Sequence, residues 1–514
     1  VPALPPSVPP RALTCARRDL NPHTRRHQNL NLARLPIPPL ARPSTLRPPR
    51  YMPRHLTDRG THRNHGIRRL STCGRPQPWR PSPSGPRSWR SGATVAMMGR
   101  VGPRASLNAL ATVGLVASVA HLGRLPRVAW DTMYAEDGFT FVQGAVDGTA
   151  WWGTPYAGYL HVLPRIVASV VTGALPVRAW AWGMAVGAAL VVGLVAALAY
   201  AVTRHLGGGR LLGVVAAAAP VLVPVAGIES IANTGNTHSY LAYGALFGIA
   251  ARPRRRWVRV VLALVVFLFA ATEIQAIVIV PAALVLLTWH TRCRWPTVGA
   301  LLLGLAAQAA AFLSTGRSRD SAVPPAVAVA RGYLFDGVLG SLVGRVGIAR
   351  TVVTVGTWWL LAAVFVGWII LLVLALRAHP RRLVLALLIV AASIGTWAMA
   401  HIYSNFAAVD FVDGPFKLVR WGTAPALLLL ATVPLVAAPL IERGGVEARA
   451  TRVLLVGLLV VQTASFVLPT SRSGTYWGAE IAKATPVCRT GAAYVDVTIV
   501  PTDAAVRLPC RYLR

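Results

Sequence analysis

From about residue 105 onward, long runs of apolar residues alternate with short polar connections. Each run is close to the roughly 17 to 25 residues that a helix needs to cross ~30 Å of hydrocarbon. We therefore expect an all-α polytopic membrane protein. The pattern predicts eleven transmembrane helices, at about 105–123, 179–203, 211–227, 237–251, 257–271, 274–290, 297–314, 352–376, 382–401, 421–440 and 452–468.

A further segment, 159–175, is ambiguous because it is short and carries His161, Pro164 and Arg165. Short cytoplasmic loops of membrane proteins are enriched in Lys and Arg. If 159–175 does not span, the basic connections all fall on one side, at 204–210, 251–259, 289–295, 377–382 and 441–452. We expect 159–175 to be an amphipathic helix in the outer interface. The N-terminus is then cytoplasmic and the C-terminus extracytoplasmic.

The acidic residues give a check on this topology, because they were not used to set it. Fifteen of the 17 acids follow residue 100. The topology puts 13 of these 15 outside or at outer helix ends, and only Glu442 and Glu447 inside. Any chemistry is therefore expected on the outer face.

Composition agrees with a membrane protein, since 54% of the residues are hydrophobic and only 13% are charged. The net charge of +35 could suggest a nucleic-acid partner, but residues 1–100 alone hold 19 of the 52 basic residues and 18 of the 39 prolines. Dense proline, high charge and low hydrophobicity favour disorder. We expect residues 1–97 to be disordered, either as a basic arm on anionic lipid or as an extension upstream of a start near Met97. No nucleic-acid partner is expected.

Residues 98–468 then form the transmembrane domain, and 469–514 a small extracytoplasmic tail. In the tail, Cys488 and Cys510 flank a stretch in which apolar and polar residues alternate. Alternation predicts a short strand or hairpin. An oxidising compartment permits a disulfide between the two cysteines, and such a bridge would be structural.

The first outer segment opens with WDTMYAEDGFTF, residues 130–141, which holds Asp131, Glu136 and Asp137. Outward carboxylates can bind a divalent metal, act as a general base for a hydroxyl or carry ions. They can also be ordinary polar loop residues that cap a helix. Asp131, nearest the helix end, is interpreted as a cap or a solvated residue, and Glu136 with Asp137 as the functional pair.

Aromatic residues follow this pair, at Trp151, Trp152, Tyr156 and Tyr159. Such rings suit the head-group level of a membrane, and they can stack on sugar rings.

The acidic pair followed by the interfacial segment resembles the GT-C superfamily of membrane glycosyltransferases, which use polyprenyl-phosphate sugars. The stretches EDGFTFVQGA and PYAGYLHVLPR resemble those of GT-C-like proteins from high-GC actinobacteria, and 50 Arg against 2 Lys fits such a genome. The resemblance covers roughly residues 100–468. It implies that Asp137 or Glu136 deprotonates the acceptor hydroxyl, with or without help from a divalent metal ion, Mg²⁺ or Mn²⁺, that the two carboxylates bind. Asp137 is chosen because Gly138 beside it leaves it less crowded.

The resemblance also implies cationic groups for the lipid phosphate that leaves. Arginine binds phosphate through two parallel hydrogen bonds. The candidates are Arg165, Arg317, Arg319, Lys417 and Arg420. Each can equally be an interfacial cation that reaches toward lipid head groups.

A second polar group, GIESIANTGNTHSYLAYG, lies between two predicted membrane helices. Asn236 and His238 are carried over from the resemblance as sugar or phosphate contacts, although they can also cap the helix ends. Glu273, a lone carboxylate in an apolar stretch, is expected to face the same cavity. Tyr159 and His161 complete the predicted substrate contacts.

The predicted function is transfer of a sugar from a polyprenyl-phosphate donor to an extracytoplasmic glycan, lipid or protein. The alternative is a transporter or flippase for a lipid-linked envelope precursor, and a third possibility is a noncatalytic scaffold. The sequence has no half-to-half repeat and no P-loop motif, and its ionisable residues gather at the outer face rather than the midplane. These features favour the enzyme.

Overall fold

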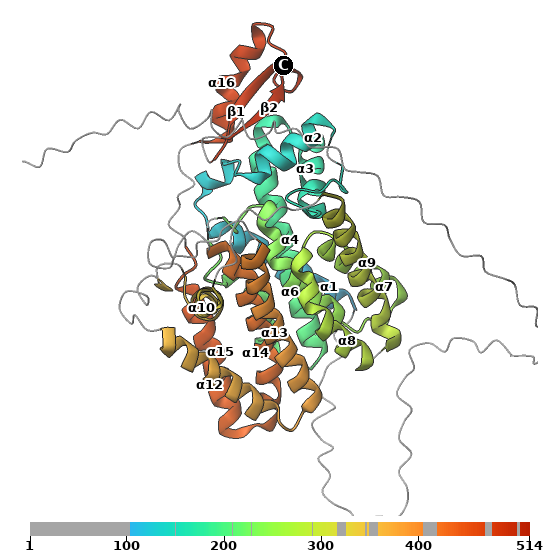
Figure 1. Ribbon diagram of the computed structural model, residues 1–514, viewed down its shortest axis with the longest axis vertical. Helices are drawn as coiled ribbons and strands as arrows, with labels where there is room; N and C mark the ends of the chain where they lie inside the picture. Colours follow the sequence, from blue (N-terminus) through green and yellow to red (C-terminus); the bar gives the residue numbers. More distant parts are fainter. Residues whose placement is uncertain are drawn as a thin grey trace, which may run out of the picture. The chain divides into compact units, whose positions relative to one another are not determined.

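The computed structural model describes residues 103–149, 151–207, 209–227, 229–289, 291–315, 325–344, 347–348, 358–403, 419–467, 475–500 and 504–514. The predicted disordered segment, 1–97, lies outside these residues. The longer elements (Figure 1) are α1 Pro103–Gly123, α3 Val162–Ala174, α4 Trp180–His205, α5 Arg210–Leu222, α6 His238–Ala250, α7 Arg256–Ala270, α8 Val280–Trp289, α9 Thr291–Thr315, α12 Trp358–Leu376, α13 Pro380–Tyr403, α14 Thr423–Arg443, α15 Gly445–Thr463 and α16 Trp477–Arg489. The short helices are α2 Gln143–Asp147 and α10 Ala326–Gly332, and the strands are β1 Tyr494–Thr498 and β2 Ala505–Pro509.

Several helices could cross a membrane, as the sequence predicts. Among the described residues, five are long and apolar enough, at Val177–His205, Cys293–Thr315, Trp359–Leu376, Pro380–Ile402 and Arg420–Arg443. The expected count of about eleven is not confirmed. Helices α5 and α6 have 13 residues each, which is only about 20 Å of helix.

The segment 274–290 also differs from the expected uniform helix. Its first six residues, Ile274–Ile279, form a 3₁₀ helix, and α8 then runs for 10 residues. The ambiguous segment 159–175 forms α3, whose 13 residues reach about 20 Å and fall short of ~30 Å of hydrocarbon. Its predicted place in the outer interface stays a prediction.

Small residues let α1 lie close against α4. A Cβ atom on Gly193 would stand 2.5 Å from the carbonyl oxygen of Gly114, so only glycine permits this approach. Buried alanines extend the same face of α4, including Ala189 and Ala196. Small residues at such positions are the usual means by which membrane helices pack closely.

Arg124, directly after α1, joins three parts of the chain. Its buried guanidinium donates to the carbonyl oxygens of Val221 at 3.0 Å, Val223 at 3.2 Å, Ala226 at 3.3 Å and Phe466 at 3.3 Å. A buried charge is costly unless it is hydrogen-bonded, and here four carbonyls compensate it. Arg124 therefore fixes the end of α5 and the start of the loop that leads to α6.

The segment 315–351, between the predicted spans 297–314 and 352–376, is helical over most of its described residues. Helix α10 continues into a π-helical turn, Tyr333–Val338, which packs against α12, α13 and α14. The Tyr333 hydroxyl lies 3.0 Å from Ser393 Oγ. The segment packs on these helices because its apolar side chains are buried there, among them Leu334, Phe335 and Val338.

The C-terminal tail contains the expected β structure and a helix that was not predicted. Strands β1 and β2 pair antiparallel, and Cys488 and Cys510 form the predicted disulfide. Helix α16 precedes the hairpin, and its Trp477 stacks on Trp180 of α4 with 6.3 Å between ring centroids. The tail also packs on the segment that follows α1, where the Val500 amide donates to the Met133 carbonyl at 3.0 Å.

Candidate functional site

The acidic pair lies at a sharp change of backbone direction. Ala135 has a φ of 44°, a left-handed value that is uncommon for a residue other than glycine. A π-helical turn, Asp137–Val142, follows directly, and such turns occur frequently at functional sites. As a result, the two adjacent carboxylates point into different surroundings.

Asp137 is directed into the protein and is only 3% exposed. Its Oδ2 accepts a hydrogen bond from the Thr234 amide at 2.9 Å, and its Oδ1 accepts from the Gly235 amide at 2.7 Å and from the Thr234 hydroxyl. Three donors thus hold this carboxylate against the loop before α6. Asp137 therefore acts as a structural anchor.

The space that Gly138 was expected to leave beside Asp137 is occupied. A Cβ atom on Gly138 would stand 2.6 Å from Cδ1 of Ile499 and 2.9 Å from Cγ of Met133. The glycine admits the C-terminal tail rather than a ligand. The reason for preferring Asp137 over Glu136 as the base is therefore wrong.

Glu136 lines a cavity of about 450 Å³. Its Oε2 atom is buried and has no hydrogen-bond partner among the described residues. The charge of Glu136 also helps to raise the pKa of Tyr156, after burial, which is the larger cause. Glu136 is therefore the member of the pair that is available for chemistry.

The cavity collects most of the predicted site residues that the structure describes. It is lined by Glu136, Phe141, Tyr156, Ala157, Tyr159, His161, Gly235, Asn236, His238, Glu273, Ile274, Gln275, Ile277, Phe312, Met399, Ala400, Arg420 and Trp421. Segments far apart in the sequence contribute, from the segment that follows α1 to the start of α14. The prediction that Glu273 faces the same cavity as Glu136 agrees with this lining.

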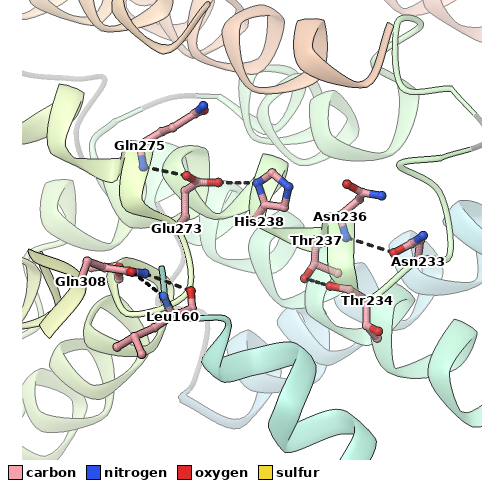
Figure 2. A network of polar contacts seen from close by, with 10 residues as sticks. Leu160, Asn233, Thr234, Asn236, Thr237, His238, Glu273, Gln275 and Gln308 are labelled. Atoms are coloured by element: carbon pink, nitrogen blue, oxygen red, sulfur yellow. Dashed lines mark hydrogen bonds and ion pairs between the residues drawn. The ribbon is translucent and has the colours of Figure 1, made fainter. Parts of the chain in front are cut away.

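His238 and Glu273 form a close pair on one wall (Figure 2). His238 Nδ1 lies 2.5 Å from Oε2 of Glu273, while the other oxygen of Glu273 accepts the amide of Gln275 at 2.6 Å. Glu273 thus caps the 3₁₀ helix Ile274–Ile279 and orients the imidazole at the same time. A hydrogen bond to one ring nitrogen fixes the role of the other.

His161 stands beside this pair, with 6.4 Å between its ring centroid and that of His238. It is buried among Phe141, Tyr156 and Tyr159, and neither ring nitrogen has a hydrogen-bond partner among the described residues. Burial, followed by the charges of His238 and Arg165, holds the pKa of His161 well below its usual value. His161 is therefore neutral near pH 7.

Arg165 lies behind the cavity wall rather than on it. The residue is 4% exposed, and its guanidinium carbon is 5.7 Å from the ring centroid of Phe141. Arg420 does line the cavity, 3.4 Å from Oε2 of Glu229 and 5.0 Å from the ring centroid of Trp421. Among the described residues, Arg420 is thus the predicted cationic phosphate contact that lines the cavity. Arg317, Arg319 and Lys417 lie outside the described residues.

The loop before α6 is held by its own polar side chains. The amide nitrogen of Asn236 donates to Oδ1 of Asn233 at 3.1 Å, and its side chain donates to the Glu229 carbonyl at 2.9 Å. Figure 2 shows the bond between Asn236 and Asn233 beside the bond from the Thr237 hydroxyl to the Thr234 carbonyl. Asn236 therefore both shapes the loop and lines the cavity.

Asp131 has the capping role that was expected, but for a distant helix. Its Oδ2 accepts the amide of Gly478, in the first turn of α16, at 3.2 Å. Burial raises the pKa of Asp131, and this hydrogen bond partly offsets the effect. The contact joins the segment that follows α1 to the tail.

Several important residues were not predicted. Gln308 of α9 accepts the Leu160 amide at 2.8 Å and donates to the Leu160 carbonyl at 3.2 Å (Figure 2). Asp336 is 1% exposed, and burial raises its pKa well above the usual value. The sequence did contain a signal for Asp336, since it is a lone carboxylate in an apolar stretch, and such residues often have a function. Nothing in the sequence distinguished Gln308 or Thr234.

The expected divalent cation stays a prediction. Among the described residues, no group of three or more His, Cys, Asp or Glu side chains is placed to hold a metal ion. Asp137 directs its oxygens to Thr234 and Gly235, so the acidic pair does not present a joint set of ligands.

Comparison with known proteins adds no relative: no family model matches the sequence, and no curated protein or solved structure matches it.

Proposed function

We propose that this chain is a membrane glycosyltransferase that moves a sugar from a polyprenyl-phosphate donor to a hydroxyl group of an extracytoplasmic acceptor. The observation that carries the proposal is the buried, unpartnered Oε2 of Glu136 at a cavity that also contains the His238–Glu273 pair and Arg420. A carboxylate beside cationic and hydrogen-bonding groups is suited to a reaction that removes a proton and releases a phosphate.

In the proposed reaction, Glu136 takes the proton of the acceptor hydroxyl. The acceptor oxygen then forms a bond to the anomeric carbon of the sugar, while the bond from that carbon to the phosphate oxygen breaks. The electron pair leaves with the lipid phosphate. Glu136 ends the step protonated and must release its proton before the next turnover.

Arg420 and His238 are the groups proposed to bind the departing phosphate. Arg420 can offer a planar pair of donors. Its 3.4 Å contact with Glu229 and its packing on Trp421 hold it at the cavity. His238 is oriented through Nδ1 by Glu273, which leaves Nε2 to face a ligand.

The sugar is proposed to lie among the aromatic side chains. Tyr156, Tyr159 and Trp421 all line the cavity, and aromatic rings with a polar edge suit a ligand that has both apolar and hydroxyl surfaces. The neutral His161 adds two ring nitrogens that have no protein partner among the described residues. One of them can accept a hydrogen bond from a sugar hydroxyl, and the other can donate one.

The test is a transfer assay with the purified full chain and radiolabelled polyprenyl-phosphate sugars. Glu136→Gln keeps the shape of the side chain and removes the base, so the transfer rate should fall by about 10² to 10⁴. Glu447→Gln is the matched control, because Glu447 is exposed on α15 and does not line the cavity. Full activity of Glu136→Gln, or equal losses in both variants, would contradict the proposed base.

A further inference from the structure

A second cavity lies at the other end of the helices. It has a volume of about 570 Å³ and is formed by α12, α14 and α15. The two cavities lie near opposite ends of α14. Arg420, before the start of this helix, lines the first cavity, and Arg443, at its end, lines the second. The 21 residues of α14 span about 30 Å. We call the second cavity the arginine-end groove.

The walls of this groove are apolar along the depth of the helices. They include Trp368, Leu371 and Leu374 of α12 and Leu454 and Leu458 of α15. Leu371, Leu374 and Leu454 are at least half exposed. Two of the contributing helices, Trp359–Leu376 and Arg420–Arg443, have the length and composition to cross a membrane. An apolar groove of this kind suits a hydrocarbon chain.

Charge gathers at one end of the groove. Among the described residues, the ends of α12–α15 nearest the groove carry Arg377, Arg381, Arg382, Arg443, Arg449 and Arg452 against Glu442 and Glu447. At the opposite ends, Arg420 is the one described arginine. This asymmetry favours an occupant with a negative group at one end and a hydrocarbon chain at the other.

Two arginines line the groove itself, and they differ in their surroundings. Arg443 donates to the Ala375 carbonyl at 3.3 Å and lies 3.4 Å from Glu447, so it joins α12 to α14. Arg377 is exposed and has no hydrogen-bond or ion-pair partner among the described residues. Arg377 is thus the cation that can bind a head group.

We propose that the arginine-end groove binds an anionic glycerophospholipid. One acyl chain lies between α12 and α15, and the head-group phosphate contacts Arg377. The basic connections predict that this end faces the cytoplasm, where anionic lipids attract Lys and Arg near the membrane surface. This site is separate from the proposed transferase site and does not depend on that activity.

The experiment uses the purified full chain in detergent with equimolar phosphatidylglycerol and phosphatidylcholine of identical acyl chains. Native mass spectrometry counts each lipid that the protein retains. Wild type should retain phosphatidylglycerol preferentially, and Arg377→Gln should lower that preference by roughly three- to tenfold. Arg256→Gln is the matched control, because Arg256 is an exposed arginine at the start of α7, outside the groove, and it should keep the wild-type preference.

A second variant tests the apolar part of the groove. Leu374→Trp adds ring atoms to a half-exposed wall position, and it should reduce retention of both lipids while the unfolding temperature stays close to that of wild type. Equal retention of the two lipids by wild type, or the same loss in Arg256→Gln as in Arg377→Gln, overturns the proposal. A dimer that Leu374→Trp converts to monomer would identify a second copy as the occupant, and would overturn it too.

Discussion

Thr234 and Asp137, 97 positions apart, are joined by two hydrogen bonds, from the Thr234 amide and the Thr234 hydroxyl to the two oxygens of the Asp137 carboxylate. This contact fixes the segment that follows α1 against the loop before α6. Glu136, one residue earlier, is held at the cavity as a consequence. Asp137 therefore anchors the segment, and its neighbour Glu136 is the acid proposed for the chemistry.

That division predicts different effects of two isosteric substitutions. Asp137→Asn replaces one carboxylate oxygen with an NH₂ group, which would face the hydrogen-bond donors of Thr234 and Gly235. We therefore expect a loss of about 1–3 kcal/mol in the free energy of unfolding. Glu136→Gln should leave the unfolding temperature near that of wild type. Thermal unfolding of both purified variants measures this. Destabilisation by Glu136→Gln with no effect of Asp137→Asn would reverse the assigned roles.

The His238–Glu273 pair predicts non-additive effects on transfer. If Glu273 acts by orienting His238, the double variant His238→Gln, Glu273→Gln should be little worse than the more damaging single variant. The coupling energy should be on the order of 1–3 kcal/mol. Transfer rates in a double-mutant cycle measure it. As a control, His238→Gln combined with Glu480→Gln, in α16, should give additive effects, and additivity in both cycles would show that the pair does not act as a unit.

The depressed pKa of His161 predicts a loss of stability in acid. The unfolded chain binds a proton at this histidine below about pH 6.5, whereas the folded protein does not. Stability from this residue is therefore present above pH 6.5 and lost as the pH falls toward the folded-state pKa. The unfolding temperature of His161→Phe should decline less than that of wild type between pH 7 and pH 5. His205→Gln, an exposed control, should follow wild type.

Asp336 predicts a dependence of the opposite sign. Burial raises its folded-state pKa well above the usual 3.8, so the folded protein holds a proton that the unfolded chain releases as the pH rises. The destabilisation is thus absent in acid and grows above about pH 4. Asp336→Asn should raise the unfolding temperature at pH 7 and have a smaller effect at pH 4. An equal effect at both values would contradict a carboxyl that is costly to ionise.

The disulfide predicts an effect on both the tail and the site. Cys488 and Cys510 are 22 residues apart, and removal of a bridge over such a loop costs about 3 kcal/mol. Because Ile499 and Val500 of the bridged tail pack on the segment that carries Glu136, Cys488→Ser should also lower the transfer rate. Cys293→Ser, at a cysteine of α9 that lies outside the tail, is the control. A wild-type transfer rate for Cys488→Ser would separate the tail from the site.

The residue pattern was enough to recognise a membrane protein and the polar segments that meet at the cavity. Apolar runs of membrane-crossing length depend on composition alone, so they could be recognised without the fold. The same holds for the alternating stretch between Cys488 and Cys510, which became β1 and β2. The count of spans was less accessible, because α5, for example, ends at Leu222 and not near 227, where Arg124 binds the carbonyl oxygens of Val221 and Val223.

Which of the two acids faces the cavity depends on the folded chain. Glu136 and Asp137 are equivalent in a sequence, since adjacency says nothing about direction. The left-handed Ala135 and the π-helical turn that follows it separate their side chains, and Thr234 and Gly235 then take up Asp137. Contacts of such long range depend on how helices pack, and a local pattern of residues does not encode them.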